Sequence, residues 1–355
     1  MDTLTHGLVG ALLARATART DPRSLPVRTR IWIGFLAGIF PDIDFIVWFF
    51  NRQQYLLIHR GLTHSLVMLP LWTLLLSFIF SWIYRGRYSW RAFLPVTALA
   101  IAAHIGADVL TSFGTMIFAP ISDIRVSVPT TFVIDPYFTG IVVAGLAGSW
   151  VFRHSVLPAG IALALLAGYI GFQNSLREQA QHWGAAYAQG RGWTPAEVMA
   201  EAQPLSPFNW QVIVARRNAY GVLQYRIAYV NLHQRTVPSP VPAHAGLLNT
   251  LWHAYRPLAH PGWRRLSFLN GTPDTRRFEW RAWKSRALRP YRRFSLFPFA
   301  TGETLIKGHR CALFGDVRFL LPAPHAPHLV YGLCRNHGIW FAPRALSGLP
   351  DRMSS

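Results

Sequence analysis

The strongest constraint on this fold is a set of long apolar segments in the first half of the chain. Residues 66–84 carry no charged side chain and match the ~20 residues that a helix needs to cross a bilayer core. Residues 93–110 form another such segment, interrupted only by His104 and Asp108. Of the 355 residues, 51% are hydrophobic and only 14% are charged, against roughly 25% charged residues in soluble domains. This balance excludes a disordered chain and an ordinary soluble enzyme, and it indicates a membrane protein.

Four more apolar segments belong to the same predicted bundle. They cover residues 4–16, 31–50, 137–152 and 156–172. The first of them has an aspartate before it and arginines after it, which is the reverse of the charge order in a signal peptide. We therefore expect it to be a retained first helix. The sequence predicts an all-α polytopic membrane helix bundle of five to six spans over residues 1–173.

Arginines in the connections between these segments predict the orientation of the bundle. Nine lie in one set of loops, at residues 15–30, 85–91 and 153, and three lie in the alternate set, at Arg52, Arg60 and Arg125. Because short cytoplasmic loops are enriched in arginine and lysine, we expect the nine in the cytoplasm. This orientation places the N-terminus and the loops 51–64 and 113–136 on the outer side of the membrane in a multi-pass protein. With six spans, the rest of the chain also emerges outside.

The chain changes character at residue 174 and is expected to form a second domain over residues 174–355. No segment of this domain is long and apolar enough to span a membrane. Alternating stretches predict strands at 211–214, 222–230 and 311–321. Helices are expected at 173–189 and at 194–202, the second with Thr194 as its N-cap. The sequence thus predicts a C-terminal, strand-containing α+β domain.

This second domain is strongly basic, with 23 Arg and Lys residues against 8 Asp and Glu residues. Such a domain suits contact with anionic lipid headgroups or with an acidic polymer. Nucleic acid is a less favoured partner, because an exported domain rarely meets it. Cys311 and Cys334 lack the Cys-x-x-Cys spacing, and the sequence leaves open whether they pair in an oxidising compartment.

Ionisable side chains inside the bundle are few and chemically alike. Such groups are costly at membrane depth, so each one is a functional hypothesis. They are His6, Asp42, Asp44, His59, His64, His104 and Asp108. Imidazole nitrogens and carboxylate oxygens are ligands of Zn²⁺ and similar ions. The predicted topology brings these groups toward the outer leaflet, so we expect a divalent metal site there, zinc being the favoured ion.

Local spacing supports ligation by the histidines. His104 and Asp108 are four residues apart and therefore lie on one face of a helix. His59 and His64 flank Gly61, where a turn would bring both rings together. The alternative for a single histidine in a membrane bundle is a hydrogen-bonded packing role.

The two aspartates of the second apolar segment follow a proline. Asp42 and Asp44 come after Pro41, where a helix loses a hydrogen bond and can bend. Gly34 and Gly38 precede this point and allow another helix to approach closely. The alternative to ligation for either aspartate is capping of a broken helix.

Seven donors exceed the three or four protein ligands of one zinc ion. Either two ions lie about 3.5–4 Å apart, or some donors orient ligands or take part in catalysis. Asp44 is a candidate for a catalytic role as well as for ligation. Arg60 and Arg125 are candidates for holding phosphate oxygens, Arg60 as a catalytic residue. Asp135 is a candidate ligand or general base, its alternative role being the N-cap of the helix that follows.

Four segments within the first 175 residues resemble a known bacterial family. They are Met1–His6, Pro41–Asp44, His59–Ser65 and the His-x3-Asp-x2-Thr-Ser-Phe-Gly-Thr motif at 104–115. They look like the inner-membrane, metal-dependent hydrolases of the family that includes a LexA-regulated member. The resemblance implies a polytopic membrane protein with a bound divalent metal and hydrolase activity. It also implies that the seven His and Asp residues are metal ligands, and it implies no substrate.

Together these features predict a metal-dependent hydrolase that acts on a phosphoester or another bond of a lipid or membrane-associated substrate. Two alternatives stay open, a transporter of metal ions or protons and a non-catalytic envelope protein with a structural metal. A transporter should continue its ionisable groups toward the cytoplasmic side. The sequence offers none in the inner halves of the helices, which favours a one-sided pocket.

Overall fold

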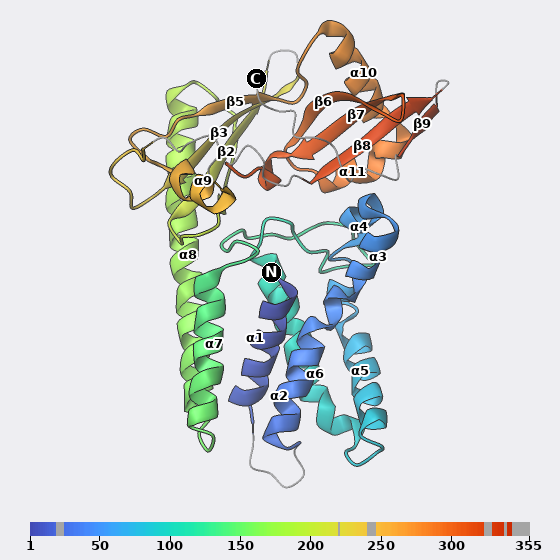
Figure 1. The fold of residues 1–355 in the computed structure, drawn as a ribbon, viewed down its shortest axis with the longest axis vertical. Coiled ribbons are helices and arrows are strands. Elements are labelled where there is room, and N and C mark those ends of the chain that lie inside the picture. The colour runs from blue at the N-terminus through green and yellow to red at the C-terminus, as the bar shows by residue number, and fades with distance from the viewer. Residues whose placement is uncertain (19–24, 219–220, 240–245, 323–328, 337–338, 343–355) are drawn as a thin grey trace. The chain divides into compact units, whose positions relative to one another are not determined.

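The computed structural model describes residues 1–18, 25–218, 221–239, 246–322, 329–336 and 339–342. The chain divides into two compact units, Met1–Ser175 and Leu176–Ser355 (Figure 1). The boundary falls within one long helix, α8 (Leu157–Gly190). This helix joins the apolar segment 156–172 and the predicted helix 173–189 without a break. Arg19 and Arg23, two of the nine arginines used to predict the orientation, lie outside the described residues.

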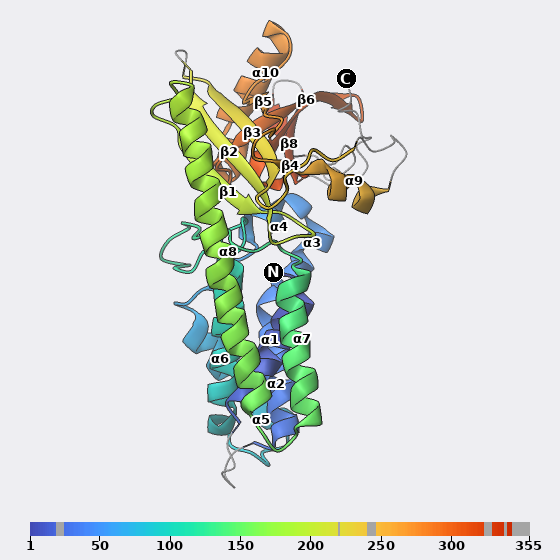
Figure 2. The same ribbon diagram turned by 90° about the vertical axis from the view of Figure 1, so that its left-hand side faces the viewer.

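The first unit is helical, as predicted. Besides the start of α8 it contains α1 (Thr3–Ala16), α2 (Val27–Ile39), η1 (Phe40–Phe45), α3 (Ile46–Phe50), α4 (Arg52–Ile58), η2 (Leu62–His64), α5 (Leu69–Ile83), α6 (Trp90–Val109) and α7 (Pro136–Val151). Within the unit, α7 and the first half of α8 form a helical hairpin (Figure 2). The two elements marked η are short 3₁₀ helices, and η1 begins beside Pro41, where the sequence predicts a bend.

Three helical segments among the described residues are long and apolar enough to cross a membrane. They are Val27–Phe50, Trp90–Val109 and Leu157–Gly190. The pair Gln54–His64 and Leu69–Ile83, bent by 78°, makes a fourth if it is counted as one span. The count of five to six spans therefore stays a prediction.

Glycines set the approach of α1 and α2. A Cβ atom on Gly34 would lie 2.4 Å from the carbonyl oxygen of Gly10, and one on Gly38 would lie 2.6 Å from the carbonyl oxygen of His6. Side chains are excluded at these contacts, so the two helix backbones touch, as in small-xxx-small packing. The contact fixes His6 beside the C-terminal end of α2.

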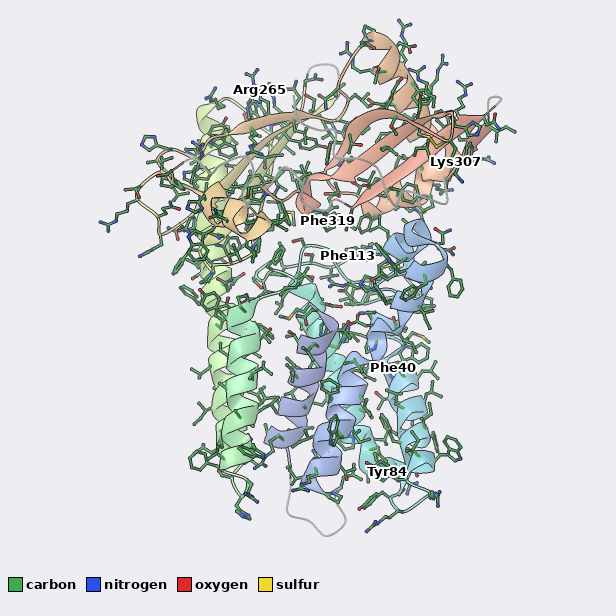
Figure 3. The ribbon with its side chains drawn as sticks, viewed as in Figure 1. Phe40, Tyr84, Phe113, Arg265, Lys307 and Phe319 are labelled. Atoms are coloured by element: carbon green, nitrogen blue, oxygen red, sulfur yellow. A yellow bond between two sulfur atoms is a disulfide. The ribbon has the colours of Figure 1, made fainter. Side chains whose placement is uncertain are left out.

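The helix connections of the first unit separate into two ends. Figure 3 labels Tyr84, at the turn between α5 and α6, at one end and Phe113, beyond the C-terminus of α6, at the other. Buried Arg15 belongs to the Tyr84 end, where its guanidinium donates hydrogen bonds to the carbonyls of Arg153 and Ser155. Pro41 and the residues that follow it lie toward the Phe113 end.

The second unit contains two mostly antiparallel sheets, with strands at the predicted stretches 211–214 and 222–230. The third predicted strand, 311–321, ends earlier, because the Asp316 side chain caps a 3₁₀ helix over residues 317–319. The first sheet has the order β1–β2–β3–β4 with β5 also paired to β3, and the second has the order β6–β7–β8–β9. The C-terminal half of α8 packs on the first sheet through Leu176, Ala180 and Ala188. The elements are β1 (Glu197–Ala202), β2 (Asn209–Arg217), β3 (Leu223–Asn231), α9 (Leu247–Ala254), β4 (Arg256–Pro257), β5 (Arg264–Ser267), α10 (Pro273–Lys284), η3 (Arg286–Leu288), α11 (Arg289–Phe294), β6 (Pro298–Ile306), β7 (His309–Asp316), η4 (Val317–Phe319), β8 (Val330–Asn336) and β9 (Ile339–Phe341).

The helix predicted over residues 194–202 is wrong. Glu197–Ala202 is strand β1, paired antiparallel with β2 so that Glu197 faces Ala215 and Ala202 faces Trp210. Thr194 and Pro195 do form a local N-terminal helix signal. Pairing with a strand that lies further along the chain overrides it, because Ala200 and Ala202 are buried against the sheet core.

The two cysteines are paired. Cys311 and Cys334 occupy opposite positions on β7 and β8 and form a disulfide. At the end of β7, the buried carboxylate of Asp316 accepts hydrogen bonds from the Arg318 guanidinium at 3.0 and 2.9 Å. Because the burial cost is offset by this charge, the pKa of Asp316 lies below its usual value.

Replacement of Gly34 by alanine is expected to destabilise the first unit by about 1–3 kcal/mol, because the new methyl group would collide with the α1 backbone. Gly140→Ala is the matched control, since a Cβ atom at Gly140 would meet no heavy atom of the described residues within 4 Å. Thermal unfolding of the detergent-solubilised full chain should show a lower midpoint for Gly34→Ala alone. Equal midpoints for the two variants would contradict the close backbone contact.

Glu279, on the buried face of α10, should make stability depend on pH. Burial raises the pKa of Glu279 from 4.5 to about 7. The unfolded chain loses this proton at a lower pH than the folded chain does. Stability should therefore fall between pH 4.5 and 7, by at most about 3 kcal/mol, and stay reduced above that range. Unfolding midpoints measured at pH 5 and pH 8 should differ less for Glu279→Gln than for the unchanged chain, and identical differences would refute this effect.

Candidate metal centre

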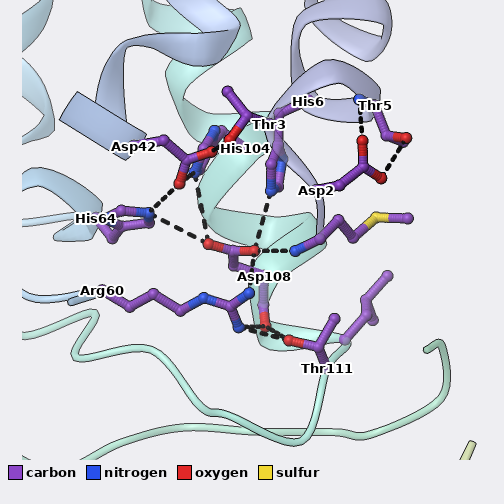
Figure 4. A network of polar contacts seen from close by, with 12 residues as sticks. Asp2, Thr3, Thr5, His6, Asp42, Arg60, His64, His104, Asp108 and Thr111 are labelled. Atoms are coloured by element: carbon purple, nitrogen blue, oxygen red, sulfur yellow. Dashed lines mark hydrogen bonds and ion pairs between the residues drawn. The ribbon is translucent and has the colours of Figure 1, made fainter. Parts of the chain in front are cut away.

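Five of the seven predicted donors meet in one network at the Phe113 end of the first unit. Figure 4 shows His6 from α1, Asp42 from η1, His64 from η2, and His104 and Asp108 from α6. Two longer helices and two short 3₁₀ helices thus supply one cluster. The 3₁₀ geometry of η1 and η2 turns Asp42 and His64 toward the last turns of α6.

Four atoms in this network face one another. Nε2 of His64 lies 3.4 Å from Oδ1 of Asp42 and 3.3 Å from Oδ2 of Asp108. Nε2 of His104 lies 3.6 and 3.4 Å from the same two oxygens. Ligand bonds of 2.0–2.1 Å in a tetrahedral zinc site imply ligand-to-ligand separations of about 3.3 Å. The four nitrogen–oxygen separations are therefore close to those expected around one tetrahedral ion, and one ligand atom from each of the four residues lies within 4.8 Å of the other three.

Three of these four atoms are buried without a hydrogen bond to any described residue. They are Nε2 of His64, Nε2 of His104 and Oδ2 of Asp108. Buried polar atoms are normally satisfied, and each exception needs an explanation. A divalent cation bound between two neutral imidazoles and two carboxylates would satisfy them and neutralise the charge of Asp42 and Asp108. The donor set fits a metal ion.

The other atom of each proposed ligand is held by the protein. Nδ1 of His104 donates a hydrogen bond to the carbonyl oxygen of Gly38 at 2.6 Å. The hydroxyl of Thr3 donates to Oδ2 of Asp42 at 2.6 Å. Since Nδ1 of His104 carries the proton, its Nε2 presents a lone pair to the centre of the cluster. Such outer contacts orient metal ligands.

The negative charge of Asp108 is compensated by several neighbouring groups. Its Oδ1 lies 3.0 Å from Nε2 of His6 and 2.9 Å from a guanidinium nitrogen of Arg60, and the amino group of Met1 also contacts it. Arg60 further donates to the carbonyl of Asp108 and to the hydroxyl of Thr111. His6 and Arg60 therefore contact Oδ1 of Asp108, whereas Oδ2 of the same carboxylate is one of the four facing atoms.

Asp44 and His59 form a second group, which shares His64 with the first. Nδ1 of His59 donates to Oδ1 of Asp44 at 2.9 Å, and Oδ2 of Asp44 accepts from the hydroxyl of Thr63 at 3.2 Å. That hydroxyl also lies 2.9 Å from Nδ1 of His64. These donors already satisfy one another, so the geometry favours an orienting role for Asp44 toward His64 over ligation of a second ion.

Two predicted polar residues lie away from the cluster of facing atoms. The guanidinium of Arg125 donates to the carbonyls of Leu57, His59 and Gly114 and packs over the ring of Phe113. These hydrogen bonds to backbone tie the site loops together. Asp135 accepts from the backbone at the start of α7 and from the hydroxyl of Tyr169, and it is in neither group.

Sequence reasoning missed two contributors to the site. One is Thr3, which lies in the opening motif that carries the family resemblance. Its place in that motif and its hydroxyl group were the features from which a role in the site could have been predicted. The Gly38 carbonyl has no side-chain signal, because every residue has a carbonyl. Only the helix-packing role of Gly38 was predictable.

Comparison with known proteins supports the family resemblance. The family model described as YdjM inner membrane protein matches residues 1–180, which include all seven donors. The uncharacterized protein YfhP of Bacillus subtilis (strain 168) is 29% identical over 176 residues, 48% of this chain and 52% of that protein. The chain thus matches about half the length of this curated relative. No solved structure matches the chain.

Metal content should separate ligands from orienting residues. His64→Ala removes one facing nitrogen, and the purified full chain should lose its bound metal. Asp44→Asn should keep the metal with an affinity lowered roughly 10–100-fold, the usual effect of altering an outer contact. Elemental analysis after dialysis against graded chelator concentrations measures both. Equal loss in the two variants would show that Asp44 binds an ion directly.

Proposed function

The chain belongs to the YdjM inner membrane protein family, and from this premise we propose that it is a membrane-embedded, divalent-metal-dependent hydrolase. Its substrate in this proposal is a phosphoester of a lipid or lipid-linked molecule. The observation that carries the proposal is the set of four facing atoms of Asp42, His64, His104 and Asp108, three of them buried without a hydrogen bond within the described part of the chain.

The metal in this proposal is one zinc ion. Two imidazoles and two carboxylates at tetrahedral spacing suit zinc better than the octahedral, oxygen-only sites of magnesium. Bound there, the ion would supply Lewis-acid chemistry to a phosphoryl oxygen. No second ion is needed, because Asp44 and His59 already satisfy each other.

His59 and Asp44 are the proposed proton-transfer pair. Asp44 accepts the Nδ1 proton of His59, which leaves Nε2 of His59 to take a proton from a nucleophilic water. The side chains of both residues keep 10–13% of their surface exposed, so water can reach them. Orientation of a histidine base by a carboxylate is a recurrent catalytic arrangement.

Arg60 is the proposed stabiliser of developing negative charge. Its guanidinium is buried beside Asp108, and its Nε–H has no hydrogen-bond partner among the described residues. A preorganised cation in a water-poor site lowers the energy of an anionic phosphoryl transition state. The backbone of Arg60 is in the left-handed region at a φ of 60°, a strained conformation of the kind that active sites often hold.

The location of the site in the membrane is part of the proposal. The nine-to-three arginine pattern supports an outer-facing site. The disulfide between Cys311 and Cys334 supports an extracytoplasmic second unit, because disulfides persist in oxidising compartments. The exposed face of α10 carries Arg276, Arg277 and Lys284 around Trp280, which supports contact of this unit with anionic headgroups.

A structural metal is the second candidate function, and one observation favours it. Four protein donors close the coordination of a structural zinc ion, whereas catalytic sites keep one position open. The partial exposure of Asp42 favours catalysis, since this ligand can give way. The full chain with cobalt in place of zinc distinguishes a catalytic site from a structural one. Its visible spectrum should change on addition of inorganic phosphate if the site is open, and should stay constant if the site is closed.

Hydrolysis itself is tested with the metal-loaded full chain and a panel of phospholipids that includes phosphatidic acid. We expect release of inorganic phosphate or of a phosphorylated headgroup. His59→Ala should lower kcat roughly 10²–10⁴-fold, the usual contribution of a general base, and should retain bound metal. His154→Ala, an exposed histidine outside the cluster, is the matched control. No hydrolysis of any lipid by the metal-loaded chain would refute the function proposed here.

A further inference from the structure

The side chains of the candidate metal centre differ in their exposure. His64 and His104 are completely buried and Asp108 is nearly so. Asp42 keeps 11% of its side-chain surface exposed, and Asp44 and His59 keep similar fractions. The centre is therefore accessible from the side that η1 and the C-terminal end of α4 form.

A cluster of large apolar side chains borders this open side. No residue of α3 is buried, and Phe49 and Phe50 are 75% and 85% exposed. Ile43 is exposed between the two aspartates of η1. We call the following five exposed residues the apolar lip: Ile43, Phe45, Ile46, Phe49 and Phe50.

Ring contacts connect the apolar lip to the centre. Phe45 packs against Trp48 and Tyr55. Tyr55 in turn stacks on the imidazole of His59, with ring centroids 4.5 Å apart. A chain of ring contacts thus runs from the exposed Phe45 of the lip to the partly exposed His59 of the centre.

The apolar lip and the polar groups of the centre lie side by side, as the hydrocarbon chain and the polar head do in an amphiphile. Exposed phenylalanine and isoleucine side chains favour contact with hydrocarbon over contact with water. The polar groups lie on the same short helix, because Asp42 and Asp44 are the neighbours of Ile43 in η1. A molecule with a hydrocarbon chain and a phosphate head can contact both at once.

We propose that the apolar lip binds the hydrocarbon chain of a phosphate-bearing lipid whose head reaches the metal centre beside Asp42. This inference rests on the proposed function and makes it more specific, because it assigns the lipid specificity to named residues. Free inorganic phosphate or a short phosphoester would have no contact with the lip. The competing explanation is that the lip contacts bulk membrane lipid like any other lipid-facing surface.

The experiment uses the metal-loaded full chain in phosphatidylcholine nanodiscs with a trace of a photoreactive probe. The probe is a phosphonate analogue of phosphatidic acid with a diazirine in one acyl chain, which cannot be hydrolysed at the phosphoester. Labelling of the peptide that contains residues 43–50 should saturate with probe and should be displaced by unlabelled phosphatidic acid. Added phosphatidylcholine should not displace it.

Two double variants separate the lip from other exposed apolar residues. Phe49→Ala with Phe50→Ala should lose the saturable labelling and keep the bound metal. Ile121→Ala with Ile134→Ala is the matched control, since these side chains are 80% and 65% exposed and lie outside the lip. The control should label as the unchanged chain does.

The outcomes distinguish this inference from the function on which it rests. Labelling at 43–50 that fails to saturate, or that phosphatidylcholine displaces equally well, refutes specific lipid binding by the apolar lip. This holds even when the chain hydrolyses phospholipids. Saturable labelling that Phe49→Ala with Phe50→Ala removes supports the lip. If that result comes with no lipid hydrolysis, the lip binds lipid and the hydrolase function alone is refuted.

Discussion

An ionised carboxylate in the interior of a membrane bundle is stable only when its charge is compensated, and Asp108 is such a group. His6 of α1, Arg60 in the turn before η2 and His64 of η2 approach it, and His104 lies one helical turn before it. Removing any of these partners leaves a buried charge less compensated. One electrostatic requirement therefore holds together the N-terminal end of α1, the turn and short helix that follow α4, and the C-terminal end of α6.

Helix packing makes this arrangement possible. The direct contact of α1 and α2 at Gly10, Gly34 and Gly38 leaves the Gly38 carbonyl in position to accept the Nδ1 proton of His104. That hydrogen bond determines which nitrogen of His104 faces the centre. A bulkier residue at the helix contact would move both the carbonyl and His6. Backbone packing and ligand orientation are thus consequences of the same small residues.

The sequence is informative where a signal is local. The spacing of His104 and Asp108 predicts a shared helix face, and Pro41 predicts the break that η1 forms. The sequence identifies the seven donors. It does not identify which atom each donor presents to the centre, because contacts with residues far away in the sequence, such as the Thr3 hydroxyl, decide this. The error at residues 194–202 has the same origin, since strand β1 depends on pairing with β2. Likewise, Arg125 has the chemistry of a phosphate ligand, and only the folded loop shows its guanidinium bound to backbone carbonyls.

X-ray absorption at the edge of the metal that copurifies with the full chain tests the central claim most directly. We expect one divalent ion with about two imidazole nitrogens and two carboxylate oxygens near 2.0–2.1 Å. We also expect no metal–metal scattering near 3.5–4 Å, the separation in two-metal sites. A clear metal–metal distance would contradict the single-ion centre and would make Asp44 and His59 ligands of a second ion. A spectrum without bound imidazole would contradict the metal centre itself.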